Sequence, residues 1–239
     1  MNKNISSIAY NILNLPSTVT FSDGSTIVYS YAADGTKLRT VHTISGTVTQ
    51  KDYCANVVYE NGIQKMLLTE EGYVDLSAST PAYYYYLKDH QGNNRVVLSS
   101  GGTAVEVSHY YPFGGVFAST GNVQPYKYNG KELDTKKGLN WYDYGARHYD
   151  ATLGRWFAVD PLAEKRFSNS VYSYTSNNPI NKEEILKALV KFPSNISYLK
   201  MVKIILEQWM ALRITIPNIK IKFVRMEMDI KRKFLYIPH

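Results

Sequence analysis

The fold of this 239-residue chain is decided by three closely spaced stretches: Tyr126-Lys-Tyr-Asn-Gly-Lys-Glu-Leu133, Trp141-Tyr-Asp-Tyr-Gly-Ala-Arg-His-Tyr-Asp150 and Leu153-Gly-Arg-Trp-Phe-Ala-Val-Asp-Pro161. Each stretch combines tyrosine or tryptophan with glycine. Aromatic side chains with a polar tip favour half-buried strands, and glycine or asparagine supplies the positive φ of tight turns. The region therefore predicts short strands joined by tight turns.

The same turn chemistry continues toward the N-terminus. Turn-forming pairs recur at Asp23-Gly24, Asp34-Gly35, Ser45-Gly46, Asn61-Gly62, Glu71-Gly72, Gln91-Gly92, Gly101-Gly102, Asn129-Gly130 and Lys137-Gly138. Most are about ten or twenty residues apart, which is the spacing of successive β-hairpins. We expect a ribbon of hairpins before the three stretches.

Apolar and polar residues alternate between these turns. Val19, Phe21, Ile27, Tyr29 and Tyr31 fall on alternating positions with Thr and Ser between them. Alternation with period two places the apolar side chains on one face of a pleated strand, where they need a core. The predicted fold class is mainly β.

Composition changes abruptly near residue 180. All 15 glycines lie at or before Gly154, and 19 of the 21 tyrosines lie before Asn181. Residues 1–181 carry 15 basic and 15 acidic side chains, whereas residues 182–239 carry 12 and 5, so the net charge of +7 belongs to the tail. This difference predicts a domain boundary next to Asn178-Pro179.

The tail reads as a small basic α/β segment. Helical spacing is present over 182–191 and again from Ser197, and alternation over 219–223 and 226–230 predicts two strands. Positive charge attracts phosphate backbones, so a small nuclease-like toxin or a nucleic-acid binder is one interpretation. A merely solvated basic face and a truncated remnant are the alternatives.

Other constellations point away from metabolic chemistry. His42, His90, His109, His148 and His239 are isolated from one another and from the single cysteine, so we expect no metal site. The sequence has no glycine-rich phosphate cradle and no Gly-x-Ser-x-Gly elbow, and we expect no cofactor. It has neither a signal-peptide-like run nor an apolar stretch of transmembrane length.

Six motifs occur in one order: Tyr110-Tyr-Pro-Phe-Gly114, Tyr128-Asn-Gly-Lys-Glu132, Gly138-Leu-Asn-Trp-Tyr-Asp-Tyr-Gly-Ala-Arg147, Gly154-Arg-Trp156, Asp160-Pro161 and Tyr172-Ser-Tyr-Thr-Ser-Asn-Asn-Pro179. In this order they resemble the core domain of the Rhs, or YD-repeat, family. The stretch from Thr18 to Arg39 is similar to a YD repeat. The resemblance implies YD-repeat-like hairpins over 1–82, a repeat-associated core over 83–179 and a variable tail over 180–239.

The family resemblance also implies a function. Its β ribbon winds into a hollow shell around a C-terminal toxin, and the core closes one end. We therefore expect a structural end-cap fragment of a secreted or surface-associated toxin system of the kind used in interbacterial competition. Its expected partners are the rest of the shell or a secretion apparatus.

Family members can cleave themselves after the core by aspartyl-protease-like chemistry, in which one carboxylate is protonated and its partner ionised. Asp150 and Asp160 match best here as the carboxylates, with Arg155 between them. A turn-capping role for Asp150 and a surface ion pair for Arg155 are the structural alternatives. Because residues 162–167 lack the usual glycine, we expect at most slow self-cleavage. We expect no metabolic enzyme activity.

A different class of function stays open for the tyrosine-rich part. A row of solvent-facing tyrosines could bind sugars, which would make residues 1–181 a cell-surface glycan-binding module. Packing of the tyrosines inside a core is the alternative reading of the same stripe.

Overall fold

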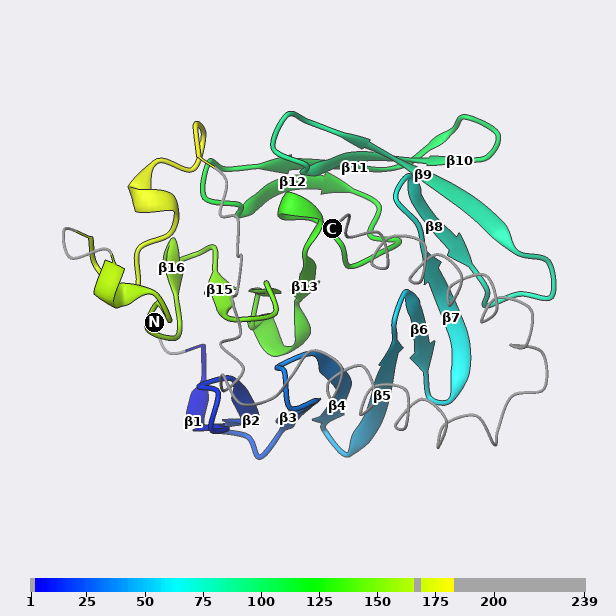
Figure 1. The fold of residues 1–239 in the computed structure, drawn as a ribbon. Helices are drawn as coiled ribbons and strands as arrows, with labels where there is room; N and C mark the ends of the chain where they lie inside the picture. Colours follow the sequence, from blue (N-terminus) through cyan, green and yellow to red (C-terminus); the bar gives the residue numbers. More distant parts are fainter. Residues whose placement is uncertain (1–2, 166–168, 183–239) are drawn as a thin grey trace, which may run out of the picture. The chain divides into compact units, whose positions relative to one another are not determined.

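The computed structural model describes residues 3–165 and 169–182, which belong to one compact unit (Figure 1). They form two antiparallel β-sheets of twelve and four strands with short 3₁₀ turns, which confirms the predicted mainly β class. The predictions for the tail beyond residue 182 concern residues outside this description.

The larger sheet is a meander in which every strand pairs with its neighbours in sequence. Its strands are β1 (Ile5–Tyr10), β2 (Pro16–Phe21), β3 (Thr26–Tyr31), β4 (Lys37–Ile44), β5 (Thr47–Cys54), β6 (Val57–Glu60), β7 (Ile63–Leu68), β8 (Gly72–Asp75), β9 (Ala82–Lys88), β10 (Asn94–Ser99), β11 (Ala104–Tyr110) and β12 (Val116–Thr120). The sheet runs without interruption across residue 82, and the boundaries proposed from sequence remain predictions.

Most predicted turn glycines lie in hairpin turns. Gly24 and Gly62, for example, have φ values of 80° and 81°, which favour glycine because it lacks Cβ. Gly72 differs from these, since it is the first residue of β8 and directly follows the turn between β7 and β8. A Cβ atom on Gly72 would stand 2.0 Å from the carbonyl oxygen of Tyr84, so this glycine permits close approach of two backbones.

The smaller sheet is built from the stretches that opened the sequence analysis. Its strands are β13 (Glu132–Asp134), β14 (Trp141–Asp143), β15 (His148–Asp150) and β16 (Arg155–Trp156), paired in that order. The Lys136–Gly138 3₁₀ turn joins β13 to β14. Gly138, Gly145 and Gly154 therefore lie in the three short connections between these strands.

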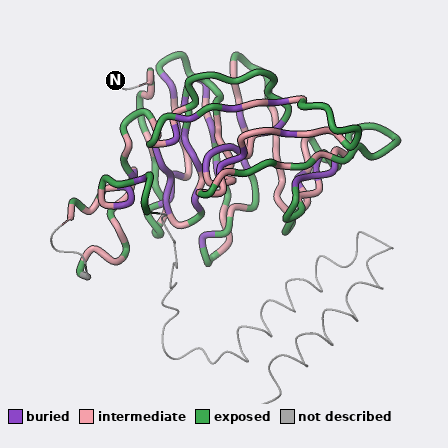
Figure 2. Tube along the Cα trace, turned by 90° about the horizontal axis from the view of Figure 1, so that it is seen from above, coloured by how far each residue is buried: buried purple, intermediate pink, exposed green. Residues whose placement is uncertain are grey.

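The two sheets share a core at β2 and β3. Val19, Phe21, Ile27 and Tyr29 are buried and pack with Leu139 and Trp141, which come from the smaller sheet and its approach. The apolar face predicted from alternation is thus confirmed. Figure 2 colours the chain by burial and shows buried stretches interspersed with intermediate and exposed ones.

A second core lies farther along the meander. Val58, Met66 and Tyr73 of β6, β7 and β8 pack with Val97 of β10, and Tyr126 is packed against them. Strands separated by some forty residues therefore contribute to one cluster, and Figure 1 shows that the meander curves.

Candidate functional site

The four-stranded sheet has two chemically different faces, because residues alternate along each strand. In register, Asp143 lies opposite Glu132 and His148, and Trp141 lies opposite Asp134 and Asp150. The residues of this charged face are Glu132, Asp134, Trp141, Asp143, His148 and Asp150. The opposite, aromatic face carries Leu133, Tyr142, Tyr149 and Trp156.

Motifs that are far apart in the sequence meet on the aromatic face. The members of this aromatic cluster are Tyr110, Tyr128, Tyr142, Tyr144, Tyr149, Trp156 and Tyr174, all buried. The rings of Tyr149 and Tyr174 stack with centroids 4.2 Å apart, and Tyr144 meets Trp156 edge-on at 5.0 Å. Five of the six family-like motifs thus contribute to one packed centre.

Tyrosine hydroxyls fix the Tyr110–Gly114 motif onto this cluster. Tyr128, Tyr149 and Tyr142 donate hydrogen bonds to the carbonyl oxygens of residues 112, 113 and 114 at 2.9, 2.8 and 2.9 Å. A Cβ atom on Gly114 would lie 2.6 Å from the Tyr128 ring. Buried hydroxyls need partners, and here the loop backbone supplies them.

The charged face meets basic side chains of the larger sheet. Lys37 of β4 places Nζ 2.7 Å from Glu132 and 2.6 Å from Asp143. Lys51 of β5 lies 3.3 Å from Glu132, and the Tyr53 hydroxyl donates to the same carboxylate at 2.9 Å. Acidic side chains of one sheet therefore lie against basic side chains of the other.

Electrostatics decides the ionisation of this group. Burial raises the pKa of Glu132, but attraction to Lys37 and Lys51 outweighs it, so the pKa lies below its ordinary value. The pKa of Asp143 is held well below its ordinary value by Lys37 in the same way, despite burial. Burial disfavours the charged form of Lys37, yet its two carboxylates hold its pKa well above the usual range.

A histidine pairs with the third acidic residue. His42 Nε2 of β4 lies 2.9 Å from Asp134 Oδ2, and the Tyr29 hydroxyl donates to the same oxygen at 3.3 Å. Burial raises the pKa of Asp134, but the His42 hydrogen bond contributes to holding it below its ordinary value. Neighbouring His148 is fully enclosed, and burial lowers its pKa.

Asp150, one predicted catalytic carboxylate, is the fourth acidic residue of the charged face. Only 2% of its side chain is exposed, and Oδ2 lies 2.6 Å from Nζ of Lys3, just before β1. Its other oxygen accepts a hydrogen bond from the Thr152 backbone at 2.8 Å. The turn-capping role considered from sequence is therefore present in the structure.

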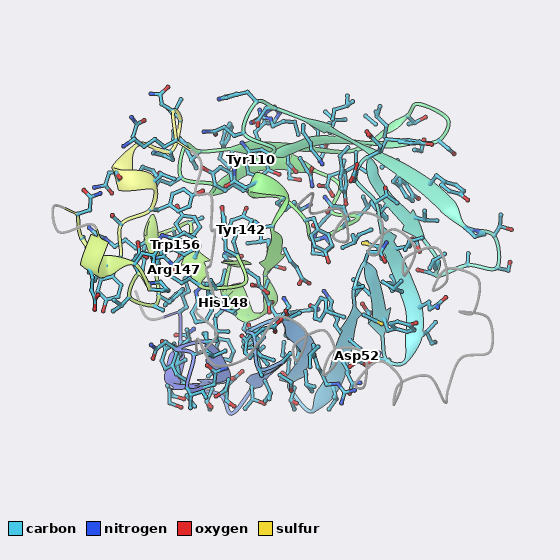
Figure 3. All side chains as sticks on the ribbon, viewed as in Figure 1. Asp52, Tyr110, Tyr142, Arg147, His148 and Trp156 are labelled. Carbon is cyan, nitrogen blue, oxygen red and sulfur yellow. The ribbon has the colours of Figure 1, made fainter. Side chains whose placement is uncertain are left out.

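Asp160, the second predicted carboxylate, lies beyond β16 in a turn. Its Oδ1 accepts a hydrogen bond from the Leu162 backbone at 2.9 Å, and its Oδ2 lies 3.9 Å from Arg147. The Arg147 guanidinium is buried and stands 4.2 Å from the Trp156 ring centre (Figure 3). Asp160 is thus linked to the edge of the aromatic cluster.

Arg155, the third predicted site residue, is exposed and lies opposite Asp150 in strand register. The ion pair of Asp150 is with Lys3, and that of Asp160 is with Arg147. Arg147 lies in the Gly138–Arg147 motif, three residues before Asp150. This nearness in sequence could have indicated Arg147 as the arginine beside the aspartates, in place of Arg155. No local pattern around Lys3 indicated its partner. The self-cleavage role of the three residues stays a prediction.

The remaining candidates are dispersed. Among the residues that the structure describes, no group of three or more His, Cys, Asp and Glu side chains could hold a metal ion, and Cys54 is an exposed free thiol. Most tyrosines near the centre are packed, but Tyr83 and Tyr85 of β9 are 53% and 47% exposed. Within the described residues no helix is long and apolar enough to span a membrane.

Comparison with known proteins supports the β architecture. No protein-family model matches the sequence. Over 104 residues the chain is 35% identical to salivary gland surface protein 1 of Aedes aegypti, a stretch that covers 42% of this chain and 3% of that protein.

Solved structures give a wider match. A crystal structure of TcdB2-TccC3-TEV superposes with a TM-score of 0.62 at 20% identity, covering 75% of this chain and 10% of that one. The chain has an Rhs-like β fold. A TcdB2-TccC3 structure without the hypervariable C-terminal region gives 0.61 at 19% identity over 75% and 10% of the two chains. A Photorhabdus luminescens Tc holotoxin pore gives 0.60 at 19% over 74% and 10%.

Proposed function

We propose that this chain is a structural end-cap fragment of an Rhs-type toxin shell. The observation that carries the proposal is the match of three quarters of the chain to TcdB2-TccC3 structures. In this role β1 to β12 form part of the shell wall, and the four-stranded sheet packs against them and closes the end of the shell. The chain spans about a tenth of those solved chains, so the rest of the wall would come from further strands.

The contacts between the two sheets suit an end cap that must stay attached to the wall. Four acidic residues of the charged face pair with basic residues of the N-terminal strands and their approach: Lys3, Lys37, His42 and Lys51. These partners are mostly buried, where such pairs are costly to break. The aromatic cluster fixes the other face. We further propose a location outside the producing cell, with the remaining shell or a secretion apparatus as partner.

A segment exchange tests the end-cap role. Residues 1–182 would replace the matching segment of TccC3 in the TcdB2-TccC3 complex, followed by cryo-electron microscopy and limited proteolysis of the enclosed C-terminal region. We expect a closed shell with a protected C-terminal region. A folded replacement segment in a shell that stays open would reject the proposal. Exchange of the native segment with itself, carrying only the junction residues, is the control.

Slow self-cleavage is a second proposal, based on the surroundings of Asp150 and Asp160. Each carboxylate has its own cation, Lys3 or Arg147, and a backbone N–H donor. An aspartyl pair shares one proton between its two carboxylates, whereas Asp150 and Asp160 each contact a separate cation. We therefore expect little conversion over hours to days.

Intact-mass measurement of the wild type beside Asp160→Asn tests this second proposal. A fragment ending near residue 162 that accumulates slowly in the wild type and is missing from the variant supports it. Complete and rapid conversion of the wild type contradicts the slow rate. A fragment that also forms in the variant contradicts the role of Asp160.

A further inference from the structure

The larger sheet has an inner and an outer side along β6 to β11. Its inner side carries the second core, to which Val58, Met66, Tyr73 and Val97 belong. Because successive side chains of a strand point to opposite sides, the residues between these core positions point to the outer side. Figure 1 shows the four-stranded sheet on the concave side of the meander, so the outer side faces away from it.

Strand register arranges the outward residues of these strands into three rows that run across the sheet. The first row crosses β6 to β9, and the second and third cross β9 to β11. The members of these rows form the outer patch: Val57, Leu67, Val74 and Tyr83, then Tyr85, Leu98 and Ala104, then Leu87, Val96 and Val107. None of these residues carries a charge.

The same side of β2 to β5 has the composition of a solvated surface. Its rows consist mostly of polar and charged residues: Thr18, Val28, Val41 and Gln50, then Thr20, Thr26, Thr43 and Val48, then Ser30, Arg39 and Asp52. An antiparallel sheet that buries one face is commonly polar on the other. The outer patch departs from this rule within a single sheet, so it has the composition of a surface that is covered.

The middle of the outer patch is open. Tyr83, Tyr85 and Leu87 of β9 are 53%, 47% and 50% exposed. Strands about 4.8 Å apart and rows about 6.8 Å apart give the patch an area on the order of 400 Å². Each partner of a stable interface contributes roughly 800 Å², as an apolar core inside a polar rim. The outer patch is therefore large enough to be the core of such an interface.

The composition of the outer patch defines its partner. A charged partner surface would lose its hydration against the patch without gaining a counter-charge there. The partner must therefore present an apolar surface of similar extent, and a second copy of this chain does so. Residues 1–181 carry 15 basic and 15 acidic side chains, so this part of two copies meets without net repulsion.

Sheet-on-sheet packing provides the geometry for such a contact. Two sheets pack face to face about 10 Å apart with interdigitating side chains, and a two-fold axis brings the same patch of two copies together. From the extent, composition and exposure of the outer patch we propose that it is a homodimer interface, in which two copies pack sheet against sheet around Tyr85. The contact uses the face of the sheet and leaves its edges to the further strands of the proposed shell, so it does not depend on the end-cap role.

Sedimentation velocity of the full chain from about 0.1 to 100 μM tests the interface. We expect a monomer–dimer equilibrium with a dissociation constant on the order of 10 μM, at the weak end of what interfaces of standard size reach. Tyr85→Glu places a charge in the middle of the patch and should weaken dimerisation at least about tenfold. Because Tyr85 is half exposed, the new carboxylate stays hydrated in the monomer and the variant should fold.

Val48→Glu is the matched control. Val48 is 57% exposed on the outer side of β5, among the polar rows, and the substitution adds the same charge. This variant should dimerise as the wild type does. Should Tyr85→Glu fail to fold, hydroxyl-radical footprinting of the wild type replaces it. Oxidation of Tyr83 and Tyr85 should fall as the protein concentration rises, whereas oxidation of Tyr10, 46% exposed on β1, should not change.

Three outcomes would overturn the proposal. The first is a wild type that stays monomeric over the whole concentration range, because the patch then does not bind a second copy. The second is undiminished dimerisation of Tyr85→Glu, or unchanged oxidation of Tyr83 and Tyr85 on association, since the copies then meet elsewhere. The third is equal weakening by Val48→Glu, which would assign the effect to the added charge and not to the patch.

Discussion

The two faces of the four-stranded sheet are held by different physics. The aromatic face is closed by ring packing and by hydroxyls that donate to a loop backbone. The charged face is closed by ion pairs to the other sheet and borders a cavity. Apolar packing is non-directional and insensitive to pH, whereas buried ion pairs depend on both partners and on protonation. The two faces of one sheet are therefore expected to respond differently to mutation and to acid.

Tyr149→Ala should give the largest loss of stability. The side chain is fully buried at the centre of the aromatic cluster, and removing a buried ring of this size costs about 3–5 kcal/mol. Urea unfolding followed by circular dichroism measures the change in unfolding free energy. Tyr83→Ala, at an exposed position, should stay within about 0.5 kcal/mol. Similar losses in both variants would contradict the packing described.

Lys37→Met, on the charged face, should give the second largest loss of stability. It leaves Glu132 and Asp143 buried beside each other without their shared cation, which costs about 3 kcal/mol. The same unfolding measurement applies. Arg39→Met, on the same strand, breaks the more exposed pair with Asp52 and should cost less than about 1 kcal/mol. If the two variants lose the same stability, the pairs of the charged face are no stronger than surface pairs.

Acid should weaken the charged face before the aromatic face. Burial lowers the pKa of His148, so below the unfolded value of about 6.5 the unfolded chain binds more protons, and stability falls as pH drops. The slope is at most about 1.4 kcal/mol per pH unit for one group. The lowered carboxylate pKa values of Glu132, Asp134 and Asp143 add a further loss below about pH 4.

Unfolding free energies measured from pH 8 to pH 2 check this order. His148→Gln should flatten the plot of unfolding free energy against pH between pH 6.5 and 5. The steeper loss of stability at lower pH should remain. His109→Gln, at an exposed position on β11, is the matched control and should leave the profile of the wild type. A profile that is flat down to pH 5 in the wild type would be inconsistent with a buried neutral His148.

Tyr174→Phe should have the smallest effect. The variant keeps the ring in the aromatic cluster and loses a hydroxyl that donates to Asn129 Oδ1 at 2.7 Å. Because Tyr144 donates to the same oxygen at 2.5 Å, the loss should be about 1 kcal/mol. Thermal unfolding at neutral pH resolves a change of this size. A loss as large as that of Tyr149→Ala would mean that the hydroxyl hydrogen bonds contribute more to stability than the ring packing.

The strands and their buried faces could be predicted from the sequence because they depend on local pattern. Val19, Phe21, Ile27 and Tyr29 followed from alternation, and they are buried. Gly72 was assigned to a turn because the sequence does not show its contact across the sheet. A glycine is required there by the close approach of the Tyr84 backbone.

The charged face was invisible in the sequence for a different reason. Glu132 meets Lys37 and Lys51 across 95 and 81 residues, and nothing in the local sequence marks such partners. The same limit applies to Asp150, whose Lys3 partner lies at the other end of the described chain. The family resemblance suggested catalysis at Asp150, which stays a prediction. The register of β15 places Asp150 among acidic residues that pair between the sheets.

The order of the strands has a consequence for how the protein forms. Every strand of the meander pairs with its predecessor, so hairpins can add one at a time as the ribosome releases them. The basic partners on β4 and β5 are synthesised first and stay hydrated. They can form their pairs only after the acidic residues of β13 and β14 have been synthesised. We expect closure by the four-stranded sheet to be the late event of synthesis.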